Sequence, residues 1–118
     1  MSEYTKDNII LSLTLNFAID IISYCDQLEQ NRKYVIARQL LKSGTSIGAN
    51  SREAQNAESR ADFIHKFKIA AKEADEVQYW LILCKESEFY PNPSEELHNE
   101  IQSINLILSK IISSSKKS

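Results

Sequence analysis

Glycine and proline are scarce in this chain of 118 residues, which contains two of each. A β-sandwich or β-barrel needs a turn about every 8–12 residues, and turns are built largely from glycine, proline, asparagine and aspartate. So few breakers exclude an all-β protein. The contents of 42% hydrophobic and 25% charged residues are ordinary for a soluble globular protein and exclude a disordered or collagen-like chain. The composition therefore predicts a single all-α domain over residues 1–118.

Cysteines and long apolar runs are also few. Cys25 and Cys84 form neither a CxxC pair nor a disulfide framework, and both fall on apolar helix faces, so we expect them in the core. The most apolar stretch, residues 9–22, is 14 residues long and includes Asn16 and Asp20, whereas a membrane span needs about 20 apolar residues. Residues 1–7 lack the pattern of a signal peptide. These absences predict a cytoplasmic protein without a membrane partner.

Four segments show apolar residues at steps of three and four, the spacing of an amphipathic helix. The predicted helices run from about Asp7, an N-cap candidate, to Glu29, from about Lys33 to Asn56, from about Ser59 to Glu88, and onward from the cap Ser94. Ser59 and Asp62 resemble a capping box with Asp in place of Glu. Residues 113–118 are expected to be a frayed tail. Short connections force neighbouring helices to be antiparallel, which predicts an up-down-up-down four-helix bundle.

The apolar stripe of the second helix is small and polar in its middle: Ile36, Leu40, Ser43, Ile47, Asn50, Ala54 and Ala57. Within it, the run from Gly44 to Gly48 fits the GxSxG motif of serine hydrolases. That motif works at a strand-to-helix turn, and no strand precedes it here. Instead, we expect the two glycines to let a neighbouring helix approach closely, which offsets their helix penalty of about 1 kcal/mol each. We expect no catalytic residue and no enzymatic activity.

Two pairs, Asp62 with His65 and Glu95 with His98, resemble the Glu-x-x-His motif of di-iron bundles. Each histidine lies one turn into its helix. The starts of two antiparallel neighbours lie about 35 Å apart at 1.5 Å per residue, whereas a metal needs its ligands about 2 Å away. The sequence therefore predicts no metal site and no cofactor.

The third helix has a second band of residues, about 100° around the helix from its main stripe. Its members are Ile69, Glu73, Glu76 and Trp80, at steps of four, three and four. These residues either widen the boundary of the core or form an oligomer interface, because exposed tryptophan anchors mark binding surfaces.

The charges are segregated along the chain. Residues 31–72 hold nine Lys/Arg and three Asp/Glu, a net charge of +6, so the remainder carries −8. Helical spacing places one group of cations on the outer faces of the second and third helices: Arg38, Lys42, Arg52, Lys68 and Lys72. Such a face binds phosphate backbones, or it contacts the acidic half of a neighbouring subunit. Repetition of the face around an oligomer would favour nucleic acid.

The run from Gln39 to Glu53 resembles the signature of a bacterial four-helix-bundle family that is often encoded in intervening sequences of large-subunit ribosomal RNA genes. The family pattern is a Gln, then Ser-Ile-x-x-Asn-x-x-Glu, then a Phe-rich stretch leading to an Ala and a Glu. The matching residues are Gln39, Ser46, Ile47, Asn50, Glu53, Phe63, Phe67, Ala70 and Glu76. The chain departs from the pattern at Ser51, Ala54 and Lys72-Glu73, where the family prefers Ile, Gly and Gly-Ser.

Relatives in this family serve as the accessory variability determinant of diversity-generating retroelements. The resemblance implies a cylindrical homopentamer with a basic surface and, in the retroelement branch, partners that include RNA or DNA and a reverse transcriptase. Gln39, Ser46, Asn50 and Glu53 are expected to form a buried polar network that fixes helix register, with direct ligand contact as the alternative. We therefore expect a non-enzymatic, oligomeric nucleic-acid-binding or ribonucleoprotein accessory protein. The alternative is a structural or adaptor oligomer without nucleic-acid affinity.

Overall fold

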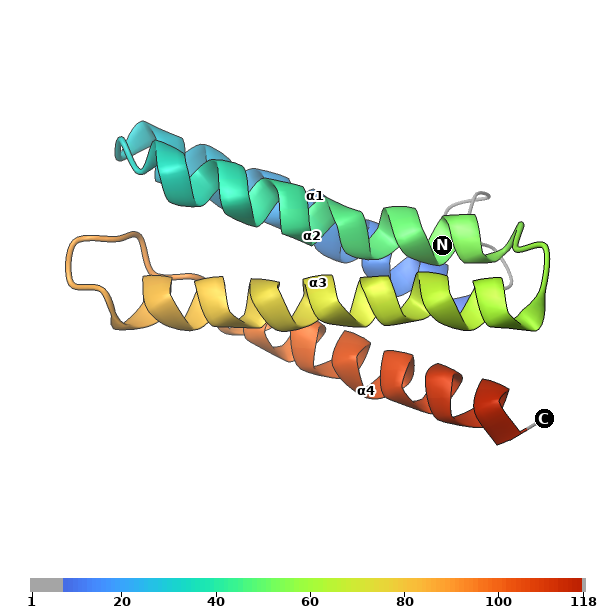
Figure 1. Ribbon diagram of the computed structural model, residues 1–118. Coiled ribbons are helices and arrows are strands. Elements are labelled where there is room, and N and C mark those ends of the chain that lie inside the picture. The colour runs from blue at the N-terminus through green and yellow to red at the C-terminus, as the bar shows by residue number, and fades with distance from the viewer. Residues whose placement is uncertain (1–7, 118) are drawn as a thin grey trace.

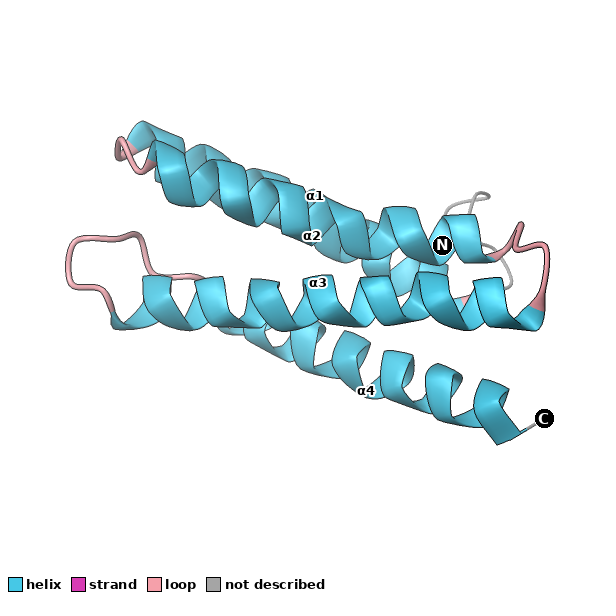
Figure 2. Cartoon of the chain, viewed as in Figure 1, coloured by secondary structure: helices cyan, strands magenta, loops and turns pink. Residues whose placement is uncertain are grey.

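The computed structural model describes residues 8–117 and contains four helices (Figure 1). They are α1 (Ile9–Gln30), α2 (Tyr34–Ala54), α3 (Arg60–Glu86) and α4 (Glu95–Lys117). No strand occurs in the part of the chain that the structure describes, and the loops gather at the two ends of the helices (Figure 2). The all-α fold predicted from the scarcity of glycine and proline is confirmed.

The helices pack in chain order around one core. α1 contacts α2 and α4, and α3 contacts α2 and α4, so each helix has two neighbours. The connections α1–α2 and α3–α4 lie at one end and α2–α3 at the other (Figure 1). This is the predicted up-down-up-down bundle, elongated to 47 × 27 × 21 Å.

Serine caps fix the starts of α3 and α4 where the sequence predicts them. Ser59 Oγ accepts a hydrogen bond from the backbone N–H of Asp62 at 3.0 Å, and Ser94 Oγ accepts one from that of Leu97 at 3.2 Å. The carboxylate of Asp62 accepts from the backbone N–H of Glu58 at 3.2 Å, one residue before the partner a capping box would use. Each cap satisfies N–H groups that the helix itself leaves unpaired.

The start of α1 and the end of α4 differ from the predicted helix ends. The N-cap of α1 is Asn8, and the candidate Asp7 lies outside the described residues. The expected frayed tail is instead part of α4, which continues to Lys117. Ile111 and Ile112 pack against the core, and no glycine or proline follows them to end the helix.

The core is made from one face of each helix. Phe17, Phe67, Ile101 and Leu108 are among its fully buried side chains. Cys25 and Cys84 are buried, as expected. Burial raises the pKa of the Cys25 thiol to about 12 and also raises that of Cys84, so both thiols stay protonated at neutral pH.

The two glycines of α2 face α1, as predicted. A Cβ on Gly44 would lie 2.9 Å from Ile21 Cγ2, and one on Gly48 would lie 3.2 Å from Thr14 Oγ1. Any side chain at Gly44 would overlap a neighbour that is fully buried. The glycines therefore set how closely α1 and α2 pack.

By length and hydropathy, α1 is apolar enough to cross a membrane, which the 14-residue stretch did not anticipate. Part of this hydropathy comes from side chains that pack inside the bundle, because seven residues of α1 are buried. The rest lies outside the core: Ile9, Leu15, Ile19 and Ile22 are exposed.

Candidate nucleic-acid interface

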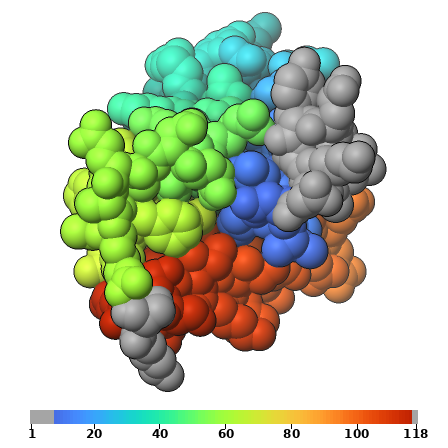
Figure 3. Space-filling model, turned by 90° about the vertical axis from the view of Figure 1, so that its right-hand side faces the viewer, coloured from blue at the N-terminus to red at the C-terminus, as the bar shows by residue number. Residues whose placement is uncertain are grey.

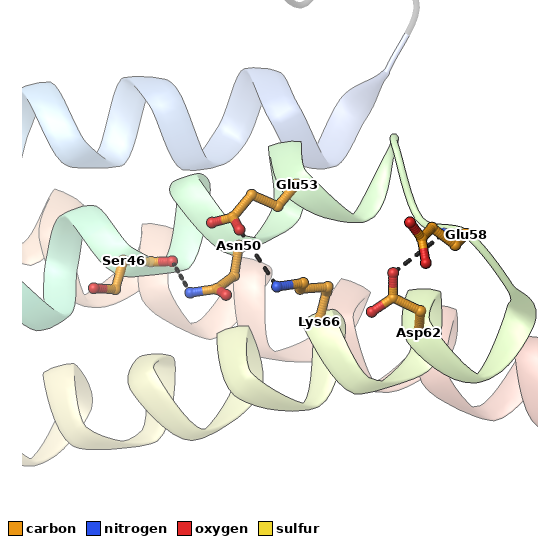
Figure 4. Close-up of polar contacts among 6 residues, drawn as sticks. All are labelled: Ser46, Asn50, Glu53, Glu58, Asp62 and Lys66. Atoms are coloured by element: carbon orange, nitrogen blue, oxygen red, sulfur yellow. Dashed lines mark hydrogen bonds and ion pairs between the residues drawn. The ribbon is translucent and has the colours of Figure 1, made fainter.

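The predicted polar network lies on α2, but it is not buried. Gln39 and Glu53 are exposed, while Ser46 and Asn50 are half-buried. Asn50 Nδ2 donates to the carbonyl oxygen of Ser46 at 2.9 Å (Figure 4). Ser46 Oγ donates to the carbonyl of Lys42, so both side chains bond to their own helix. Within one chain, the expected buried network is therefore absent from the described residues.

Glu53 instead joins α2 to α3. Its carboxylate pairs with Lys66 Nζ at 3.3 Å, and 59% of the Glu53 side chain is exposed (Figure 4). An ion pair this exposed contributes about 0–1 kcal/mol. The ion pair does show, however, which sides of α2 and α3 face each other.

Other hydroxyls occupy the core. Thr14, Ser43 and Ser51 are buried, and each donates to the carbonyl four residues earlier, at 2.7, 2.9 and 2.8 Å respectively. The predicted stripe of α2 placed Asn50 at the core, but the residue there is Ser51. One residue is a turn of about 100°, which is enough to move Asn50 toward α3.

The band predicted on α3 lies on the side of that helix that faces α2. Lys66 faces α2, and a step of 100° per residue puts Ile69, Glu73 and Trp80 on that side as well. Trp80 is half-buried and packs against the core, so widening of the core boundary is part of its role. We use the name α2/α3 face for the surface formed by the two sets, which are Gln39, Ser46 and Asn50 of α2 and Ile69, Glu73, Glu76 and Trp80 of α3.

Four of the five predicted cations sit on adjacent helices. Arg38 and Lys42 of α2 and Lys68 and Lys72 of α3 are all exposed. None of the four has an ion-pair partner among the described residues. Taking Glu53 and Lys66 as level, Lys42 and Lys72 lie about 8 Å apart along the bundle axis at 1.5 Å per residue.

Arg52 is exposed at the edge of α2 that is nearer α1. It lines a hollow of about 130 Å³ between α1 and α2, together with Leu11, Leu15, Ala18 and Ala49. Helical spacing keeps Arg38, Lys42 and Arg52 within an arc of about 80° on the outer side of α2, and Arg52 differs from the other two in lining this hollow.

The surface around this hollow was not found from the sequence. Leu15, Ile22 and Leu41 are 36%, 47% and 39% exposed along the seam between α1 and α2. We use the name α1/α2 face for Leu11, Leu15, Ala18, Ile19 and Ile22 of α1 with Leu41, Thr45, Gly48, Ala49 and Arg52 of α2. The signal is present, since residues 11, 15, 18 and 22 follow helical steps of four, three and four. It was hidden because the core stripe of the same helix, which includes Phe17 and Ile21, is apolar as well.

An acidic cluster lies at the seam of α1 and α4. Carboxylate oxygens of Asp20, Glu96 and Glu100 lie within 4.8 Å of one another. Burial, a hydrogen bond with Asp20 and the nearby negative charges raise the pKa of Glu100 to about 7. Carboxylates are the ligands of hard divalent cations, so this is where the described residues could hold one. His65 and His98 are not part of it.

Comparison with known proteins gives a family match and a structural match. Residues 6–110 match the family described as 23S rRNA-intervening sequence protein. A crystal structure from Bacteroides thetaiotaomicron, described as a protein with unknown function from the S23 ribosomal protein family, is 44% identical. The alignment covers 87% of this chain and 97% of that chain, with a TM-score of 0.82. No curated protein matches the chain.

Proposed function

The chain belongs to the 23S rRNA-intervening sequence protein family, and from this premise we propose that it is a non-enzymatic, oligomeric accessory protein that binds nucleic acid. The copy number in the proposal is five, as the sequence resemblance implies. A relation to the accessory variability determinant of retroelements, with a reverse transcriptase as partner, is part of the same proposal.

The unpaired cations of α2 and α3 support this proposal most directly. Arg38, Lys42, Lys68 and Lys72 are exposed and lack intrachain ion pairs, although the chain as a whole has a net charge of −2. A cation that neutralises a phosphate releases a counterion, and several such contacts add up to tight, salt-dependent binding. An oligomer multiplies the contacts, because every copy presents the same four cations.

The double variant Lys68→Glu/Lys72→Glu is expected to bind a structured RNA at least about tenfold more weakly than the wild type. Two lost phosphate contacts also reduce the slope of log K against log salt concentration by about 2. Fluorescence anisotropy titrations with a labelled RNA at several salt concentrations measure both quantities.

The matched control is Lys110→Glu/Lys116→Glu on α4, which changes the net charge equally. Both lysines are exposed and lie on a helix outside the basic face, so this variant should keep most of its affinity. Equal weakening by the two variants would show that only net charge matters and would contradict the assignment. Unchanged binding by the first variant would also contradict it.

The second candidate is a structural or adaptor oligomer without nucleic-acid affinity. The exposed apolar side chains along α1 and α2 favour it, since exposed apolar patches mark protein interaction sites. In this case, Lys68→Glu/Lys72→Glu would dissociate the oligomer, and RNA would leave the mass of the wild type unchanged. Light scattering after size exclusion separates the two candidates.

A further inference from the structure

We propose that the side of the bundle where α3 and α4 meet docks a basic, amphipathic segment of a partner protein. We use the name α3/α4 face for Asp75, Ile82 and Glu86 of α3 with Glu95, Gln102 and Leu106 of α4. In the end-on view, α4 (orange to red) lies below and α2 (cyan to green) above, so this face points away from the α1/α2 face (Figure 3). The proposal goes beyond nucleic-acid binding and does not depend on it.

The charge of this region is strongly negative. Residues 73–100 contain eight Asp/Glu and one Lys/Arg, a net charge of −7, which opposes the +6 of residues 31–72. Asp75, Glu86 and Glu95 are exposed, and none of them has an ion-pair partner among the described residues. A field of this sign repels a phosphate backbone and attracts lysine and arginine. The charge therefore favours a basic protein over a nucleic acid as the occupant.

A hollow of about 450 Å³ lies in this face, near the connection between α3 and α4. Its lining includes Glu95, His98, Asn99 and Gln102 of α4. Nε2 of His98 is buried and has no hydrogen-bond partner among the described residues, although buried polar groups in proteins are nearly always satisfied. The amides of Asn99 and Gln102 add donors and acceptors. The hollow thus offers hydrogen bonds to a bound chain.

Apolar side chains lie beside the hollow on both helices. Ile82 of α3 is 48% exposed and Leu106 of α4 is 59% exposed. Asn105 Nδ2 donates to Gln78 Oε1 at 3.1 Å, which fixes the level of the two helices relative to each other. From this pair, at 1.5 Å per residue, Ile82 and Leu106 lie about 8 Å apart along the bundle axis. They are close enough to contact apolar residues on successive turns of one docked helix.

Acidic residues flank these apolar side chains at both ends of the face. By the same count, Glu86 and Glu95 lie toward the connection and Asp75 lies toward the other end. An apolar centre with a charged rim is the usual anatomy of a protein interface. From Asp75 to Glu86 the face is about 16 Å long, which matches about three turns of helix. The expected occupant is such a helix, with an apolar stripe and Lys/Arg at its edges.

The test measures binding of a fluorescently labelled helical peptide of leucine, lysine and alanine, by anisotropy. Glu86→Lys/Glu95→Lys is expected to bind it at least about tenfold more weakly than the wild type, because attraction becomes repulsion. Lys85→Glu is expected to bind it more tightly, since Lys85 is the one cation of residues 73–100 and lines the hollow. Leu106→Ser, which changes no charge, should weaken binding as well.

The matched control is Asp26→Lys/Glu29→Lys, which changes the net charge equally at two exposed positions of α1. It should keep most of the affinity, and circular dichroism should show that all variants are folded. Equal weakening by the two charge reversals, unchanged binding by Leu106→Ser, or no binding by the wild type would overturn the proposal. A labelled RNA that loses as much affinity in Lys85→Glu as in Lys68→Glu/Lys72→Glu would assign this face to nucleic acid and overturn it too.

Discussion

Gly44→Leu is expected to lower the free energy of unfolding by at least about 3 kcal/mol, because it forces a side chain between α1 and α2. Even the Cβ would lie 2.9 Å from Cγ2 of the fully buried Ile21, and the other near atoms belong to the same branched side chain. Ile21 cannot turn away without moving its own helix. For a chain of this size, the melting temperature should fall by about 10 °C or more. Thermal unfolding followed by circular dichroism measures it.

Two smaller changes separate this overlap from helix propensity. Alanine favours a helix over glycine by about 1 kcal/mol, so propensity alone predicts that Gly44→Ala stabilises the protein. We expect destabilisation, because the overlap with Ile21 exceeds that gain. Gly48→Ala should be milder, since its Cβ would approach Thr14 Oγ1 to only 3.2 Å. A Gly44→Ala protein more stable than the wild type would show that the helices are free to separate.

Local signals account for most of what the sequence predicted about the fold. The caps Ser59 and Ser94 and the spacing of apolar residues depend only on near neighbours in the chain, and the structure confirms them. The prediction of a tail over residues 113–118 was wrong because it relied on their serines and lysines, and neither residue type breaks a helix; α4 continues to Lys117. Polar composition near a chain terminus is therefore a weaker signal of a helix end than a glycine or a proline is.

The candidate surfaces depend on which sides of the helices face each other, and local sequence patterns do not contain that information. Asn50 and Ser51 are adjacent in the sequence, yet Ser51 is buried in the core and Asn50 is only half-buried. The two could be told apart only from the rotation of α2 about its own axis in the bundle. The cluster of Asp20 with Glu96 and Glu100 joins helices from opposite ends of the chain. No local spacing predicts such a contact.

The polar residues of the family signature on α2 lie outside the core of one chain, whereas its apolar residues Ile47, Phe67 and Ala70 are buried. Gln39 and Glu53 are exposed, and Ser46 and Asn50 are half-buried, while the adjacent core positions hold small or apolar residues. These signature residues do little to pack a single bundle. A role between copies, on the α2/α3 face, would explain them.

Glu100→Gln is expected to stabilise the protein at pH 8 and to change its stability little near pH 4. The pKa of Glu100 is raised from an ordinary 4.5 to about 7, so the folded state holds this proton more tightly than the unfolded state does. The stability of the wild type therefore falls as pH rises from about 4.5 to 7 and stays lower above pH 7. At 1.36 kcal/mol per pKa unit, the gain at pH 8 is at most about 3 kcal/mol. Urea unfolding at pH 4, 6 and 8 gives the difference at each pH.

The control is Glu88→Gln, which removes one exposed carboxylate from the loop between α3 and α4 and should show no such pH-dependent gain. Glutamine retains an N–H that can donate to Asp20, so the substitution removes the charge while keeping the hydrogen bond. An equal gain at pH 4 and pH 8 would mean that packing, and not the ionised carboxylate, causes it. Loss of stability at pH 8 would mean that the negative charge of Glu100 stabilises the α1–α4 seam, as a cation bound by the three carboxylates would make it do.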